Sequence, residues 1–131
     1  MIAVKALGLD GVSSRVGGAG EIFPDPELTA LLEGLGRFGR ISSHDLLSRN
    51  DRPGSPLPEE TGPDGQLLAR DLQTAATFAV AADLSIAAAA LLIVSEDKKG
   101  GRLEEADLEP EFLDRGRLVL DRIAPAERLF N

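Results

Sequence analysis

The stretch from Ala69 to Asp97 constrains the fold most, because it joins two different kinds of regular structure. Its small residues predict a helix over about Gln66 to Leu84. The continuous apolar run from Ile86 to Val94 then predicts a strand in the middle of a sheet. Polar residues stand at both places: Asp71-Leu72-Gln73 near the helix start, and Ser95-Glu96-Asp97 after the strand. Ligands of open α/β sheets bind beyond the carboxyl ends of strands, so we expect these groups to meet at one edge.

The rest of the chain alternates between strands and helices. Asp25 is a predicted N-cap with Pro26 as the first helical residue, and Val12 to Ile22 is expected to form a loop. The other predicted elements are strands at Ile2 to Leu9 and Phe38 to Ser43 and a last helix at about Leu108 to Ile123. This order predicts one α/β domain over residues 1–131, with a small, mainly parallel or mixed sheet of three strands flanked by helices. The proline-rich stretch 48–65 is expected to be a flexible loop.

The composition of the chain argues against several classes of function. The net charge of −8 disfavours non-specific nucleic-acid binding. The chain has no cysteine and one histidine, His44, which excludes disulfides, thiolate metal sites and histidine-rich metal sites. We expect no metal and no cofactor. The longest apolar run is too short to span a bilayer, and no signal-peptide pattern begins the sequence, so no membrane partner and a cytoplasmic location are expected.

Four segments resemble the purine nucleoside phosphorylase and uridine phosphorylase superfamily. Arg70-Asp71-Leu72-Gln73-Thr74-Ala75 is similar to the family signature Val-Glu-Met-Glu-Ala-Ala, and Val94-Ser95-Glu96 is similar to its Val-Ser-Asp. Leu9-Asp10-Gly11-Val12-Ser13-Ser14 looks like the family's Asp-Gly-Thr-Ser segment, and Ile41-Ser42-Ser43-His44-Asp45-Leu46 like Ser-Ala-Asp-Leu-Phe-Tyr. The resemblance covers the C-terminal half of the family fold. The first half, with its glycine-rich phosphate loop and arginines, has no counterpart here.

The resemblance implies cleavage of the N-glycosidic bond of a nucleoside or related substrate, and it implies a role for particular residues. Gln73 would receive the ribose hydroxyls beside Asp71, Leu72 would pack on the sugar, and Leu47 would lie against the base. Glu96, with Asp97 next to it, would be the catalytic general acid toward the leaving base. The missing first half makes phosphate a doubtful substrate, and an inactive or incomplete single chain is expected.

Other interpretations of the same residues remain open. Asp71 and Gln73 could be first-turn helix residues favoured by the helix dipole, and Glu96 with Asp97 could belong to an ordinary charged loop. His44 and Asp45 could be a catalytic pair or a plain turn. For the whole chain, the alternatives to an enzyme are a non-catalytic ligand-binding or self-associating remnant, or one half of a two-chain enzyme completed by a separate N-terminal half chain. A small sheet with an apolar central strand also predicts a homo-oligomer.

Overall fold

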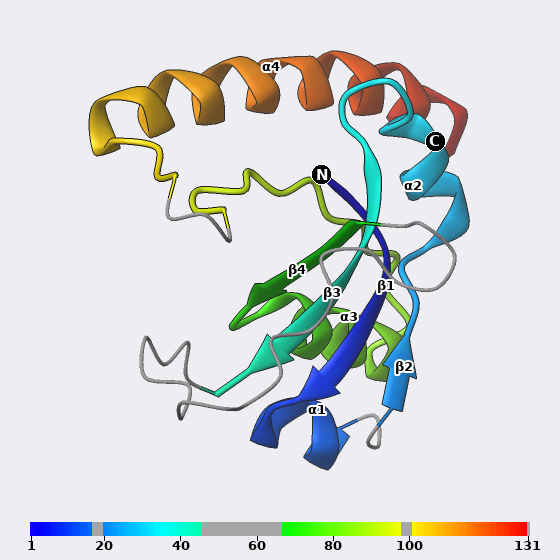
Figure 1. Cartoon of the computed structure of the whole chain (residues 1–131). Helices are drawn as coiled ribbons and strands as arrows, with labels where there is room; N and C mark the ends of the chain where they lie inside the picture. The colour runs from blue at the N-terminus through cyan, green and yellow to red at the C-terminus, as the bar shows by residue number, and fades with distance from the viewer. Residues whose placement is uncertain (17–19, 46–66, 98–100, 131) are drawn as a thin grey trace.

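A four-stranded mixed sheet organises the chain and is flanked by helices (Figure 1). The computed structural model describes residues 1–16, 20–45, 67–97 and 101–130. The strand order is β2-β1-β3-β4, in which β1, β3 and β4 are parallel and β2 is antiparallel to β1. The predicted α/β class with a mainly parallel or mixed sheet is therefore confirmed. The strands are β1 (Ile2–Leu9), β2 (Gly20–Ile22), β3 (Phe38–His44) and β4 (Leu67–Asp71).

The helices differ in how closely they follow the predicted bounds. α2 (Pro26–Leu31) begins as expected, since the Asp25 side chain accepts a 2.9 Å hydrogen bond from the backbone N–H of Leu28. α4 (Glu105–Phe130) includes the predicted last helix and extends beyond it at both ends. The remaining helices are α1 (Gly11–Val16) and α3 (Thr74–Asp83). No helix within the described ranges has the length and apolar character that crossing a membrane requires.

Two of the sequence predictions are wrong in the loop and helix regions. The expected loop at Val12 to Ile22 contains most of α1 and the whole of β2, which pairs with residues 6–8 of β1. The first part of the expected helix at Gln66 to Leu84 is instead β4, and only the part from Thr74 onward is helical. Leu67–Asp71 pairs in register with residues 39–43 of β3, and that long-range pairing overrides the helix propensity of leucine, alanine and arginine.

The segment Ile86 to Val94 is not a central strand of the sheet. It is extended, and its backbone bonds go to the start of β1 and to Asp25. Ala3 N–H donates to Ala90 O at 3.0 Å, Leu92 N–H donates to Met1 O at 2.7 Å, and Asp25 N–H donates to Ala88 O at 2.7 Å. The pairing of Ile2 with Leu91 is an isolated antiparallel bridge. Apolar runs alone do not separate a buried strand from other buried segments, and the alanines at 87–90 have low strand propensity.

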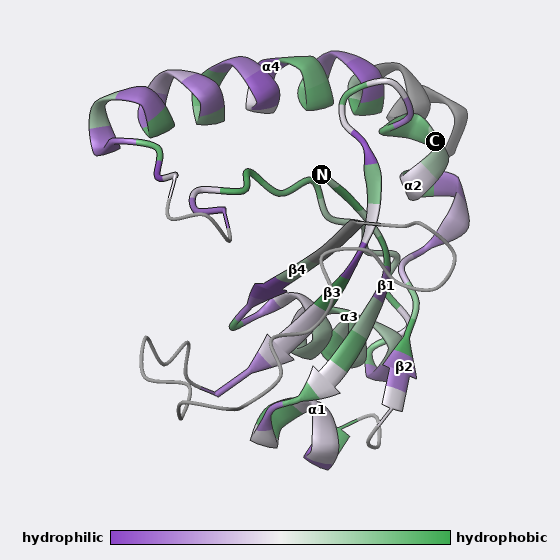
Figure 2. Ribbon diagram, in the orientation of Figure 1, coloured by the Kyte–Doolittle hydropathy of each residue, from purple (hydrophilic) through white to green (hydrophobic). Residues whose placement is uncertain are grey.

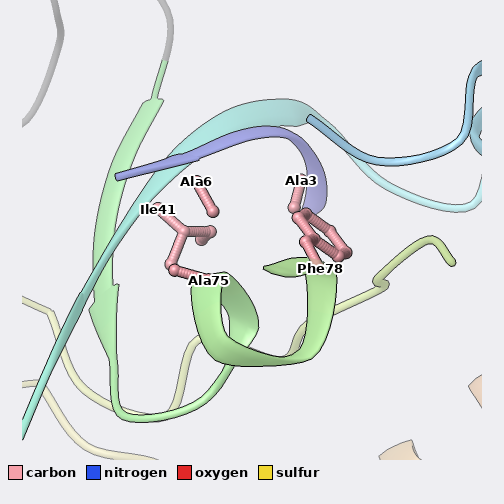
Figure 3. Packing of buried hydrophobic residues seen from close by; sticks show 5 residues of the cluster. All are labelled: Ala3, Ala6, Ile41, Ala75 and Phe78. Carbon is pink, nitrogen blue, oxygen red and sulfur yellow. The ribbon is translucent and has the colours of Figure 1, made fainter. Parts of the chain in front are cut away.

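Two apolar clusters pack on the sheet. In the first, Phe78 and Ala75 of α3 pack against Ala3, Ala6 and Ile41, all 0–2% exposed (Figure 3). The second lies at the amino end of β1, where buried Ile2, Leu32 and Leu35 meet the partly buried Ala89, Leu91 and Val119. The segment 86–94 and α4 therefore contribute to the core outside the sheet.

Candidate functional site

Asp71 ends β4 and joins that strand to both β3 and α3. Its carboxylate accepts a 2.5 Å hydrogen bond from Ser43 Oγ, and it accepts bonds from both the backbone N–H (3.1 Å) and the hydroxyl of Thr74. Ser43 Oγ in turn accepts the backbone N–H of Ala75 at 2.9 Å. Asp71 is thus positioned to satisfy the first N–H groups of α3, which have no partner within the helix.

Leu72 and Gln73 follow at the carboxyl end of β4 and face solvent. Leu72 is 43% exposed. The side chain of Gln73 makes no capping hydrogen bond to α3, although the residue occupies the N-cap position. An uncommitted amide at this edge could accept a ligand hydroxyl through its carbonyl oxygen and donate through its nitrogen. This is the place where parallel α/β sheets bind ligands.

A second polar cluster closes the carboxyl end of β1. Asp10 is buried and accepts hydrogen bonds from Ser13 Oγ at 2.5 Å and from the Ser13 backbone N–H at 2.8 Å. Burial acts to raise the pKa of Asp10, but the hydrogen bonds from Ser13 and the backbone outweigh burial and lower the pKa below 3.8. Gly8 permits this approach, because a Cβ at that position would lie 2.6 Å from Ser13 Cβ.

His44 and Asp45 at the end of β3 make separate contacts. The Nε2 atom of His44 lies 3.1 Å from Ser42 Oγ, while Asp45 Oδ1 accepts the backbone N–H of Gly11 at 3.0 Å. The two side chains are not hydrogen-bonded to each other in the described structure. A hydrogen-bonded acid–histidine pair is therefore not formed here.

Glu96 and Asp97 lie in a short hairpin and not at the end of a parallel strand. Glu96 pairs with Arg102 in an antiparallel bridge, and the Asp97 carboxylate accepts the Gly101 N–H at 2.8 Å. The segment that leads to them runs antiparallel beside the amino end of β1. The expectation that they share one carboxyl edge with Gln73 is wrong, because segment 86–94 does not join the sheet as a parallel strand.

No hydrogen bond or ion pair joins Gln73 to Glu96 in the described part of the chain. Gln73 leaves the sheet with the carboxyl end of β4, whereas Glu96 follows a segment that leaves past the amino end of β1. Leu47, the residue expected to contact the base, lies outside the described residues, as does the predicted loop 48–65.

Several residues at this edge were not expected from sequence. Ser43 and Thr74 hold Asp71, and Asp10 with Ser13 closes the end of β1. The spacing of Asp10 and Ser13, three residues apart beside a Gly, is the local signal of such a turn. The pairing of Ser43 with Asp71 spans 28 positions and leaves no local signal.

The face of the sheet opposite α3 carries positive side chains, which the alternation in Phe38–His44 could have indicated. Lys5 lies opposite Arg40 in register, and Arg70 lies opposite Ser42, so all three cations share that face. Lys5 binds Glu21 at 2.7 Å, and both arginines also have partners within the chain. These three cations therefore contribute to the fold, and they do not by themselves form a phosphate site.

Comparison with protein-family models gives no match for this chain, and comparison with curated proteins gives none either. Within the described ranges, no group of three or more His, Asp and Glu side chains is placed to hold a metal ion.

Proposed function

We propose that this chain is a nucleoside phosphorylase-like domain that binds a nucleoside, or a similar ligand rich in hydroxyl groups, without cleaving it. The ligand would lie at the carboxyl edge of β1, β3 and β4, against Leu72 and Gln73. A cytoplasmic location is part of the same proposal. The observation that carries it is the exposure of Leu72 and Gln73 at this edge while Glu96 leaves the sheet elsewhere.

The chemistry of the edge supports binding. Leu72 offers an apolar surface for a sugar ring, and the Gln73 amide offers an acceptor for its hydroxyls. The backbone that leads into these residues is anchored, because the preceding residue, Asp71, is hydrogen-bonded to Ser43 and Thr74. A prearranged edge loses less conformational entropy when a ligand binds.

The same geometry argues against cleavage by the single chain. Breaking an N-glycosidic bond needs an acid within hydrogen-bond reach of the leaving base while the sugar is held. Glu96 and Asp97 bond within their own hairpin, and no contact links Glu96 to Gln73 in the described structure. An amide at Gln73 also stabilises a developing positive charge on the sugar less than a carboxylate would.

Calorimetric titration of the full chain with inosine, adenosine and uridine tests the binding site. We expect saturable binding of at least one of them, and the Kd should rise by about 2- to 10-fold in Gln73→Ala, since one neutral hydrogen bond contributes about 0.5–1.5 kcal/mol. Thr77→Ala is the matched control, because Thr77 is an exposed polar residue one turn further along α3. Its Kd should equal that of the unaltered chain.

Two results would contradict this function. One is the absence of binding of all three nucleosides at millimolar concentration. The other is a Gln73→Ala variant that binds as tightly as the unaltered chain, which would place the ligand elsewhere.

A further inference from the structure

α4 is mostly exposed along its described side chains. None of its side chains from Glu105 to Ala124 is fully buried, and Phe112, Leu113 and Leu120 are 62%, 56% and 66% exposed. Figure 2 shows apolar and polar segments alternating along this helix. Two arginines attach it to α2 and to the turn that follows: Arg122 donates to Leu31 O at 3.1 Å, and Arg115 donates to Leu35 O at 2.9 Å. The helix is therefore held at its place while much of its apolar surface is uncovered.

The exposed apolar residues surround Gly116. Phe112, Gly116 and Leu120 are spaced four residues apart, and Leu113 lies three residues before Gly116, so all four fall on one side of the helix. A Cβ built at Gly116 would meet no atom within 4 Å. We call these four residues the Gly116 patch. An open glycine between large apolar side chains is a place where another helix can approach closely.

The Gly116 patch also borders an apolar groove of about 430 Å³ between α4, α2 and the segment 86–93. Phe112, Gly116 and Leu120 line one wall of the groove, and Arg115 is the one charged residue among the described residues that line it. A helix lying on the patch would cover the open side of this groove.

Charge is divided along α4. Residues 105–114 contain five acids and no base, while residues 115–130 contain four arginines and two acids. Favourable interaction with the helix dipole explains acids in the first turn and bases in the last turn only, and here the acids extend over almost three turns. An antiparallel partner with the same sequence would place its arginine-bearing half beside these acids.

We propose that α4 packs antiparallel against α4 of a second copy of this chain, with the two-fold axis at Gly116. Gly116 lies near the middle of the 26-residue helix, so two antiparallel copies overlap along most of their length. Such an axis sets Phe112 opposite Leu120 of the partner subunit, because both are four positions from Gly116. The interface is isologous and closed, which limits the assembly to a dimer.

Sedimentation equilibrium of the full chain at micromolar concentration tests the proposal. We expect twice the mass of one 13.8 kDa chain. Leu120→Glu and Gly116→Leu should each shift the protein to monomer, with unchanged far-ultraviolet circular dichroism. Gly116→Leu is the more secure variant, because open space surrounds that position in the single chain. Leu118→Glu is the control: Leu118 is 43% exposed on the other side of the helix, and this variant should stay dimeric.

Cross-linking tests the orientation, since the chain has no cysteine of its own. Gly116→Cys should form an intermolecular disulfide on mild oxidation, because residues at a two-fold axis approach closely. Glu109→Cys should not cross-link to itself, since antiparallel packing separates the two copies of that residue by about 21 Å along the helix. Three results would each overturn the proposal. The unaltered chain could sediment as a monomer, the dimer could persist in both Leu120→Glu and Gly116→Leu, or Glu109→Cys could cross-link efficiently to itself. A monomer would point to a different protein as the occupant of the patch.

Discussion

At the scale of single residues, hydrogen-bonded polar side chains mark where strands end and helices begin. Asp25 is the case that sequence predicts correctly, because its role as an N-cap depends on the next three residues only. Asp71 has a similar role toward Thr74, but it also accepts a bond from Ser43. The sequence suggested either a first-turn residue or a substrate ligand for Asp71. The structure gives it a connecting role between β3, β4 and α3.

Replacing Asp71 with alanine should lower the free energy of unfolding by about 1–3 kcal/mol, because Ser43 Oγ and the first N–H groups of α3 lose their acceptor. Urea denaturation followed by circular dichroism measures the change. Asp83→Ala, at the exposed end of the same helix, is the control and should alter stability by less than about 0.5 kcal/mol. Equal effects of the two substitutions would show that the Asp71 contacts do not stabilise the chain.

Asp10 should make stability depend on pH. Its pKa is lowered in the folded chain by the hydrogen bonds from Ser13. A carboxyl group with a lowered folded pKa stabilises the fold above its usual pKa of 3.8 and loses this contribution as the pH falls through the folded pKa. Asp10→Asn does not titrate and loses about 1 kcal/mol per charge-assisted bond at neutral pH.

Urea denaturation of both proteins between pH 7 and pH 3 checks the Asp10 prediction. The difference in unfolding free energy between the unaltered chain and Asp10→Asn should be constant above about pH 5 and should shrink below 3.8. A difference that is independent of pH over the whole range would rule out the contribution of Asp10.

At the scale of elements, the sequence predicted those whose signals are local. Hydrophobic pattern and capping predict β1, β3, the start of α2, and most of α3 and α4. β4 and β2 could not be predicted, because both are short and depend on pairing with distant strands. The expected central strand at Ile86 to Val94 is wrong for the same kind of reason. Residues 88–92 are partly buried against the two apolar clusters, and the segment does not enter the sheet.

The packing of α3 on the sheet should be the main apolar contribution to stability. Phe78 is 2% exposed and contacts the alanines of β1 (Figure 3). Phe78→Ala should cost about 3–5 kcal/mol through lost burial and the cavity left behind. Val80→Ala is the comparison on the same helix, since Val80 is 37% exposed and should lose less than about 1 kcal/mol. Similar losses for both would mean that α3 does not pack as described.

At the scale of the whole molecule, the chain combines a carboxyl sheet edge whose polar groups are hydrogen-bonded with a helix, α4, whose apolar surface is partly uncovered. The position of Leu72 and Gln73 at the carboxyl edge of the sheet could be predicted from the sequence. The position of Glu96 could not, because it depends on whether the segment 86–94 enters the sheet. The resemblance to nucleoside phosphorylases thus remains a prediction, and the separation of the two predicted parts of the site favours binding over cleavage.

The most direct test of binding without cleavage is the release of free base from inosine, adenosine and uridine by the purified chain, with and without phosphate. We predict no release above the uncatalysed rate in either case, because Glu96 and Asp97 follow a segment that leaves past the amino end of β1, away from a sugar held at Gln73. Base release that increases with phosphate and is abolished in Glu96→Ala would contradict it.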